Sequence, residues 1–129
     1  MGSNTGKTTP QHIIFKTRLP TLNAYILLER GHWRAAAAKK KKVEASLVWE
    51  ITAQKIQPVT DCPVNIIYHF YCKDRKQDKR NVSFVVKFIE DALQTAGLIV
   101  DDGWKYIDYP EADGFYIDKA NPRVEVFIG

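Results

Sequence analysis

The sequence contains no long apolar run and no targeting segment at its start. No stretch approaches the roughly 18 to 20 apolar residues that a helix needs to cross a bilayer. The first residues also lack the charged and apolar blocks of a signal peptide. We therefore expect a cytosolic protein that does not enter a membrane.

Cysteine is also scarce, with only Cys62 and Cys72 in the chain. The two lie at opposite ends of an apparent strand, where a rise of about 3.3 Å per residue would separate them by about 30 Å. That distance excludes a disulfide bond between them. Their spacing from His12, His32 and His69 does not match a zinc site either.

Acidic residues are fewer than basic ones, 15 against 19, which gives a formal net charge of +4 and a pI of about 9.1. This balance favours a polyanionic partner. The excess is concentrated in two short segments, although runs of this length also occur as ordinary solvated faces. The first segment is Lys39, Lys40, Lys41 and Lys42, and in the second, Lys73, Arg75, Lys76, Lys79 and Arg80 outnumber Asp74 and Asp78.

A chain of 129 residues with 45% hydrophobic content is long enough for one domain with a real core and too short for two. Residues 1–10 are small and polar without apolar periodicity, so we expect a flexible leader there. The remaining residues, 11–129, are expected to form a single domain.

Three segments in the first part of the chain carry secondary-structure signals. Residues 12–19 alternate loosely between apolar and polar types, which predicts a first strand. In residues 33–55, apolar side chains recur every four positions from Val43, which predicts a helix. Residues 64–72 alternate and are rich in β-branched and aromatic types, which predicts a central strand.

A second helix is expected at residues 81–96, with Asn81 as its N-terminal cap and Gly97 at its C-terminal end. The chain is completed by an extended return and two further strands, at residues 98–100, 104–109 and 123–128. The element order is then β-α-β-α-β-β. We expect an α+β domain with a small sheet packed against two main helices.

Acidic residues flank the second predicted helix, with Asp78 before it and the pair Asp101 and Asp102 after it. The helix spans about 22 Å and the extended return about 17 Å, so Asp78 and Asp102 can approach the same end. Mg²⁺ prefers hard oxygen ligands and is usually held by one or two carboxylates plus a substrate phosphate. A magnesium site is one interpretation; a polar turn and an unrelated loop aspartate are the other.

Three separated motifs resemble the RusA family of Holliday junction resolvases. The family pattern is D-x-D-N, a helix ending in D-A-L-x-x-A-G, a short apolar strand and then D-D. It is matched by Asp78-Lys79-Arg80-Asn81, Asp91-Ala92-Leu93-Gln94-Thr95-Ala96-Gly97 and Asp101-Asp102-Gly103-Trp104. Pro20-Thr21-Leu22-Asn23 and the tail from Asp118 to Val126 are similar to further family elements, the tail to those of its phage-borne branch. The resemblance therefore runs from about Leu19 to the C-terminus.

The resemblance implies a homodimeric endodeoxyribonuclease, dependent on Mg²⁺ or Mn²⁺, that nicks four-way junctions in DNA recombination and repair. Such proteins are often prophage-encoded, which implies the cytoplasm of a bacterial or phage-infected cell. Asp78 and Asp102 match the catalytic acids, Lys87 falls where the family has its functional lysine, and Asp101 is a further metal ligand. DNA contact is expected from the two basic segments, because phosphate neutralisation dominates sequence-independent affinity.

One residue departs from the family pattern. Arg80 stands where the family has its second acid, so a metal ligand is replaced by a guanidinium that could occupy the place of the metal. We expect junction binding to be retained and cleavage to be reduced or lost. Two alternatives remain open: a DNA-binding protein without catalysis, and a small RNA-binding or protein-interaction domain that uses the strand at 64–72.

Overall fold

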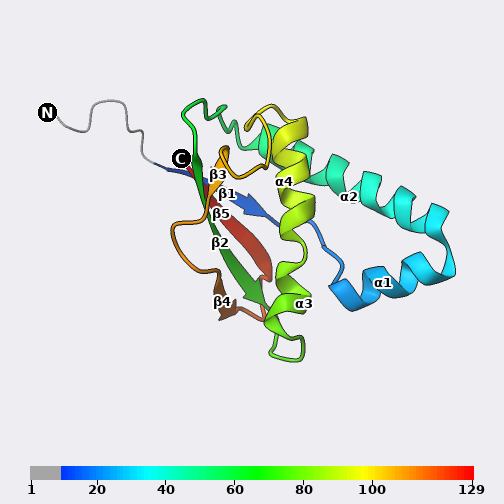
Figure 1. Ribbon diagram of the computed structural model, residues 1–129. Coiled ribbons are helices and arrows are strands. Elements are labelled where there is room, and N and C mark those ends of the chain that lie inside the picture. The colour runs from blue at the N-terminus through cyan, green and yellow to red at the C-terminus, as the bar shows by residue number, and fades with distance from the viewer. Residues whose placement is uncertain (1–9) are drawn as a thin grey trace, which may run out of the picture.

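The computed structural model describes residues 10–129, so the leader predicted at residues 1–10 lies outside the described residues except for Pro10. This part of the chain contains five strands and four helices, whose arrangement can be followed in Figure 1. In chain order they are β1 (Gln11–Phe15), α1 (Leu22–Gly31), α2 (Trp33–Ala53), β2 (Val64–Cys72), α3 (Lys79–Ser83), α4 (Val86–Thr95), β3 (Ile107–Asp108), β4 (Gly114–Ile117) and β5 (Arg123–Ile128). The domain is α+β, as expected.

The sheet is mixed and is built around β2, which confirms the central strand predicted from alternation. β5 lies antiparallel between β1 and β2. On the other side of β2, β3 pairs in parallel with its first residues and β4 in parallel with its last four. Ile66, Tyr68 and Phe70 are buried on one face of β2, whereas Ile67 and His69 on the other face are half-buried.

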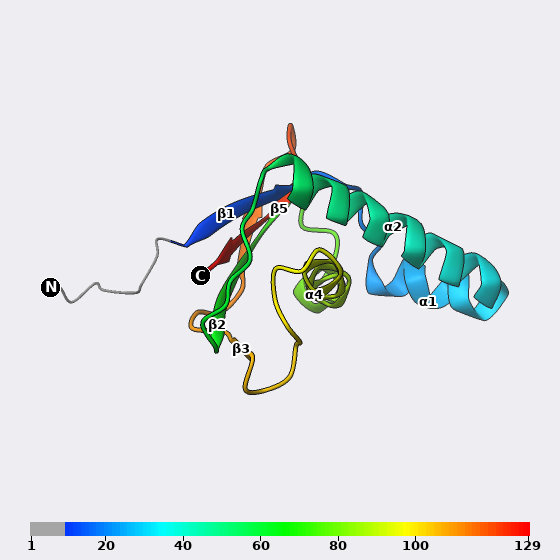
Figure 2. The same ribbon diagram turned by 90° about the horizontal axis from the view of Figure 1, so that it is seen from above.

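The helices lie on one face of the sheet and leave the other face uncovered by them (Figure 2). α4 packs against α2, and both contribute to the core with the inward side chains of β1, β2 and β5. Leu47, Ile89, Leu93 and Val126 are fully buried there. α1 and the start of α2 form a hairpin that projects from this body (Figure 1).

Side chains from the end of α2 bind the backbone at the free edge of β1. The Gln54 amide accepts from Ile14 N–H and donates to Ile14 C=O, both at 2.8 Å. The Glu50 carboxylate accepts from the backbone N–H groups of Lys16 at 2.7 Å and Thr17 at 3.1 Å, and from the Thr17 hydroxyl. The backbone groups of Ile14 and the N–H groups just after β1 are thereby satisfied without another strand.

The structure corrects the helix predicted at 81–96, which is divided into α3 and α4 by Phe84 and Val85. The Val85 N–H donates to Val82 C=O and the Lys87 N–H to Phe84 C=O, so tighter three-residue bonds replace regular helical ones there. Asn81 does not cap a helix, because Asp78 takes the cap position of α3. The Asn81 side chain is instead buried and accepts from Asn23 N–H at 2.9 Å.

Four further corrections concern elements outside that helix. α1 and β4 were not predicted. Residues 98–100 form no strand, and of the strand expected at 104–109 only Ile107–Asp108 pairs with β2. The order is therefore β-α-α-β-α-α-β-β-β, rather than β-α-β-α-β-β. Gly97 does end α4, with a positive φ of 76°.

The helix predicted at 33–55 is confirmed as α2, which buries Ala36, Val43, Leu47 and Ile51 on one face. Trp49, also in α2, is 70% exposed. Among the helices at residues 10–129, none is both long and apolar enough to span a bilayer. Cys62 and Cys72 are both free thiols.

Candidate acidic site and nucleic-acid interface

Lys87 and Asp102 lie together at the surface of α4. The Lys87 ammonium is 2.7 Å from Asp102 Oδ2 and 3.3 Å from Asp91 Oδ1, one helical turn further along. The ordinary surface pair between Lys87 and Asp91 is thus present beside the contact with Asp102. Two carboxylates therefore converge on a single cation.

The tetra-lysine segment reaches the same place from α2. The ammonium of Lys40 is 3.9 Å from Asp91 Oδ2. All four of these lysines are exposed. Lys40 of α2 therefore borders the carboxylates at α4.

The charges at this site hold each other in the ionised state. The hydrogen bond from Lys87 lowers the pKa of Asp102, and the hydrogen bond to Asp102 raises the pKa of Lys87. The Lys87 side chain is 62% exposed, so solvent screens the pair. Exposed pairs of this kind contribute at most about 1 kcal/mol to stability, which leaves the ammonium free to exchange its partner.

Glu90 is a buried carboxylate next to this surface cluster that sequence reasoning missed. It is 5% exposed and accepts hydrogen bonds from the hydroxyls of Tyr68 at 2.7 Å and Tyr109 at 2.8 Å. Burial raises the pKa of Glu90 despite these bonds. The available signal was Tyr68, because a tyrosine on the buried face of a strand requires a partner for its hydroxyl.

The structure places Asp78 apart from the acidic cluster at Lys87. Asp78 is exposed in front of α3 and lines a cavity of about 710 Å³ with Arg75 and Lys79; the lining of this cavity includes neither Lys87 nor Asp102. Asp101 is exposed, and its carboxylate accepts from the Asp102 N–H at 2.7 Å. Among residues 10–129, no group of three or more histidine, cysteine or acidic side chains is arranged to hold a metal ion.

The donor chemistry at α4 suits a magnesium ion held largely by water and substrate. Carboxylate oxygens are the ligands that Mg²⁺ prefers, and one or two are enough when phosphate supplies the rest. Asp102 and Asp91 already converge on a cation, and that cation is the ammonium of Lys87 rather than the guanidinium of Arg80. Asp102 and Asp91 are the two carboxylates that would hold the metal, and no third such ligand joins them among residues 10–129.

The second basic segment occupies the loop between β2 and the start of α3. Its members, Lys73, Arg75, Lys76, Lys79 and Arg80, are all exposed. Asp74 accepts from the Lys76 N–H at 2.9 Å and so shapes the loop. The ammonium of Lys79 lies 5.4 Å from the centre of the Phe115 ring.

Both basic segments are thus available to a polyanion. No family model matches the sequence, and no curated protein is significantly similar to it. The resemblance to the RusA family therefore depends on the motif residues themselves.

Proposed function

We propose that this protein binds branched DNA and nicks it in a Mg²⁺-dependent reaction, as an enzyme of the RusA type. The observation that supports this most is the 2.7 Å contact between Lys87 Nζ and Asp102 Oδ2. The resemblance assigns these two residues to one site although 15 positions separate them in the sequence.

Lys87 and the acids around it have separate parts in the proposed reaction. The Lys87 ammonium is exposed on a flexible side chain, so it can leave Asp102 for the scissile phosphate and stabilise the negative charge that develops there. Departure of Lys87 removes the hydrogen bond that lowers the pKa of Asp102 and leaves the Asp102 carboxylate free to act as a metal ligand. The chemistry that a bound Mg²⁺ supplies is polarisation of the phosphate and activation of a water molecule.

DNA is held by exposed cations on two elements. Lys40 of α2 borders the acidic site, and the loop after β2 carries the second basic segment. Contacts to phosphates make affinity fall steeply with salt and carry no sequence preference. A homodimer would suit a four-way junction, because one two-fold interface presents two equivalent sites to opposed strands.

The second candidate is a protein that binds junctions without cutting them. Two observations favour it: Asp78 lines a cavity that does not include Asp102, and Arg80 stands beside Asp78 where the family has an acid. With fewer carboxylates around the metal, Mg²⁺ would bind weakly.

A labelled four-way junction incubated with Mg²⁺, Mn²⁺ or EDTA separates these candidates, with a linear duplex of equal length as the control. Symmetric metal-dependent nicks support the enzyme, and a shifted but uncut junction supports the binding protein. Equal affinity for junction and duplex at the same salt would contradict both and favour the RNA-binding or protein-interaction domain.

Two substitutions test the roles of the site residues. Asp102→Asn should abolish nicking and leave junction affinity unchanged, whereas Asp108→Asn, an exposed acid in β3, should change neither. Loss of both activities in Asp102→Asn would indicate a folding role. Arg80→Asp should increase nicking, and equal robust activity with and without it would contradict the role given to Arg80.

A further inference from the structure

A positively lined cavity lies at the C-terminal end of β2. Its volume is about 520 Å³, and its walls come from the loop after β1, the end of β2, the start of β5 and α3. Lys16, Arg18, Lys73 and Arg123 line it, and no aspartate or glutamate does. Arg123 is neutralised by Asp118 and Glu125, so the three remaining cations set the charge of the cavity.

This cavity adjoins the cavity that contains Asp78. The two share Cys72, Gln77 and Val82 in their walls. The second cavity adds the cations Arg75 and Lys79 and the carboxylates of Asp74 and Asp78. The combined space, which we name the β2-end groove, passes around the end of β2 and suits an extended ligand better than a compact one.

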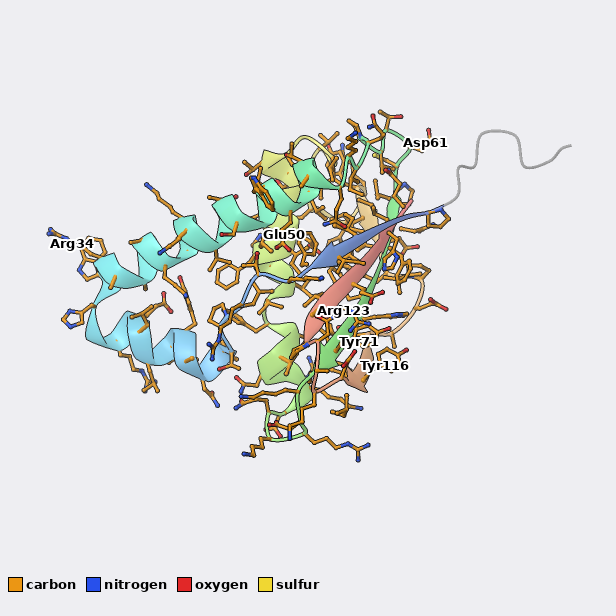
Figure 3. All side chains as sticks on the ribbon, turned by 180° about the vertical axis from the view of Figure 1, so that it is seen from behind. Arg34, Glu50, Asp61, Tyr71, Tyr116 and Arg123 are labelled. Carbon is orange, nitrogen blue, oxygen red and sulfur yellow. The ribbon has the colours of Figure 1, made fainter. Side chains whose placement is uncertain are left out.

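An aromatic pair lies beside the β2-end groove, on the sheet face that the helices leave uncovered. Tyr71 lines the first cavity and Tyr116 the second, and their rings stack with centroids 5.0 Å apart. The Arg123 guanidinium lies 3.9 Å from the centre of the Tyr71 ring, and the three side chains are labelled together in Figure 3. Tyr116 is 44% exposed, so a flat group can reach it.

We propose that the β2-end groove binds unpaired nucleotides of single-stranded DNA. Lys16, Arg18 and Lys73 take the phosphates, and the exposed ring of Tyr116 takes a base, because Arg123 and Tyr116 already cover the Tyr71 ring. Stacking on aromatic rings with cations along the backbone is the general chemistry of such binding. This rests on the proposed function in one respect: the unpaired nucleotides are those exposed at the branch point. In a duplex the faces of the bases are stacked on one another, so they cannot stack on an aromatic side chain of the protein.

Cys72 is a reporter placed where the two cavities meet. In a Cys62→Ser variant it is the only thiol of the chain, and Cys62 is exposed and lines neither cavity. The variant is alkylated with iodoacetamide alone, with a thymidine oligonucleotide, with a linear duplex or with a four-way junction. The oligonucleotide and the junction should each slow alkylation of Cys72 at least threefold, and the duplex should not.

Charge removal provides the second measurement, by fluorescence anisotropy with the same oligonucleotide. Lys16→Gln with Arg18→Gln should weaken binding about tenfold and reduce the slope of log affinity against log salt by about 1.4, since each single-strand phosphate contact contributes about 0.7. Both side chains are exposed, and the bond from Lys16 to Glu50 uses the backbone N–H, so folding is retained. Lys55→Gln, an exposed cation that lines neither cavity, is the matched control.

The outcomes separate this inference from the proposed function. Three results would contradict nucleotide binding in the β2-end groove. They are oligonucleotide binding that does not protect Cys72, equal protection of Cys72 by the duplex, and an equal loss of oligonucleotide affinity in Lys55→Gln. If the protein nicks the junction while Cys72 stays unprotected, the proposed function stands and only nucleotide binding in the groove is rejected. If the oligonucleotide protects Cys72 but the protein shows no preference for junctions, the proposed function is rejected and nucleotide binding in the groove is supported.

Discussion

Replacement of Glu50 by alanine tests whether α2 holds the end of β1 through its carboxylate. Glu50 accepts two backbone N–H groups and one hydroxyl, from Lys16 and Thr17. A hydrogen bond to a charged group contributes about 1.5 to 3 kcal/mol. The site is only half-buried, so we take the lower value for the two backbone bonds and expect a loss of about 3 kcal/mol.

Urea unfolding followed by circular dichroism measures this loss. With a slope of about 1.5 to 2 kcal/mol per molar urea, the midpoint should fall by about 1.5 to 2 M. Glu44→Ala is the matched control, because Glu44 lies on the same helix and accepts a single bond, from the Thr95 hydroxyl at 2.7 Å. It should lose at most about 1.5 kcal/mol.

A loss below about 0.5 kcal/mol in Glu50→Ala, within the range of an ordinary surface substitution, would refute the role of Glu50. Thr17→Val removes only the hydroxyl contact. If Thr17→Val and Glu50→Ala lose the same free energy, the hydroxyl rather than the backbone is the group that Glu50 holds.

Three further outcomes are expected. Gly97→Ala should cost about 1 kcal/mol of unfolding free energy and Gly97→Asn less, because φ is 76° and a Cβ meets no neighbour there, so only the backbone conformation is penalised; equal unfolding midpoints would contradict this. Burial would raise the pKa of Glu125, but hydrogen bonds with Arg123 and His12 outweigh it and lower the pKa. The stability that this adds is present above the ordinary glutamate pKa and is lost as pH falls through the lowered pKa of the folded state. Glu125→Gln should therefore flatten the acid side of a plot of unfolding free energy against pH. Asp102→Asn should return the pKa of Lys87 toward its ordinary value, as followed by NMR of the lysine side chain, because the hydrogen bond to Asp102 is the largest cause of its increase.

Some elements of this fold are determined by their own sequence, whereas others form only because they pair with a neighbouring strand. β2 was predicted to the residue, because strict alternation in a strand buried on one face is a local property. β3 has two residues and β4 four, and both exist only because β2 offers an edge to them. α1 was not predicted because it has no buried residue, so it has no apolar face from which a helix could be recognised.

The site shows the same division. The lengths of the segments allowed Asp78 and Asp102 to meet. Residue numbers alone could not predict the break at Phe84 and Val85 or the separate course of the loop before α3. The contact of Lys87 with Asp102 followed from the family resemblance rather than from spacing. Glu90 was not recognised as a site residue, since sequence alone does not say that two tyrosines from other segments reach it.

The hairpin of α1 and α2 has a consequence for motion. α1 buries no residue, and before Val43 only Ala36 of α2 is buried, so few apolar contacts oppose local opening of this arm. Segments with little burial open at a lower free energy than the core. The amide hydrogens near Trp33 should therefore exchange with solvent long before those of β2, and the adjoining lysines can shift position while the sheet stays intact.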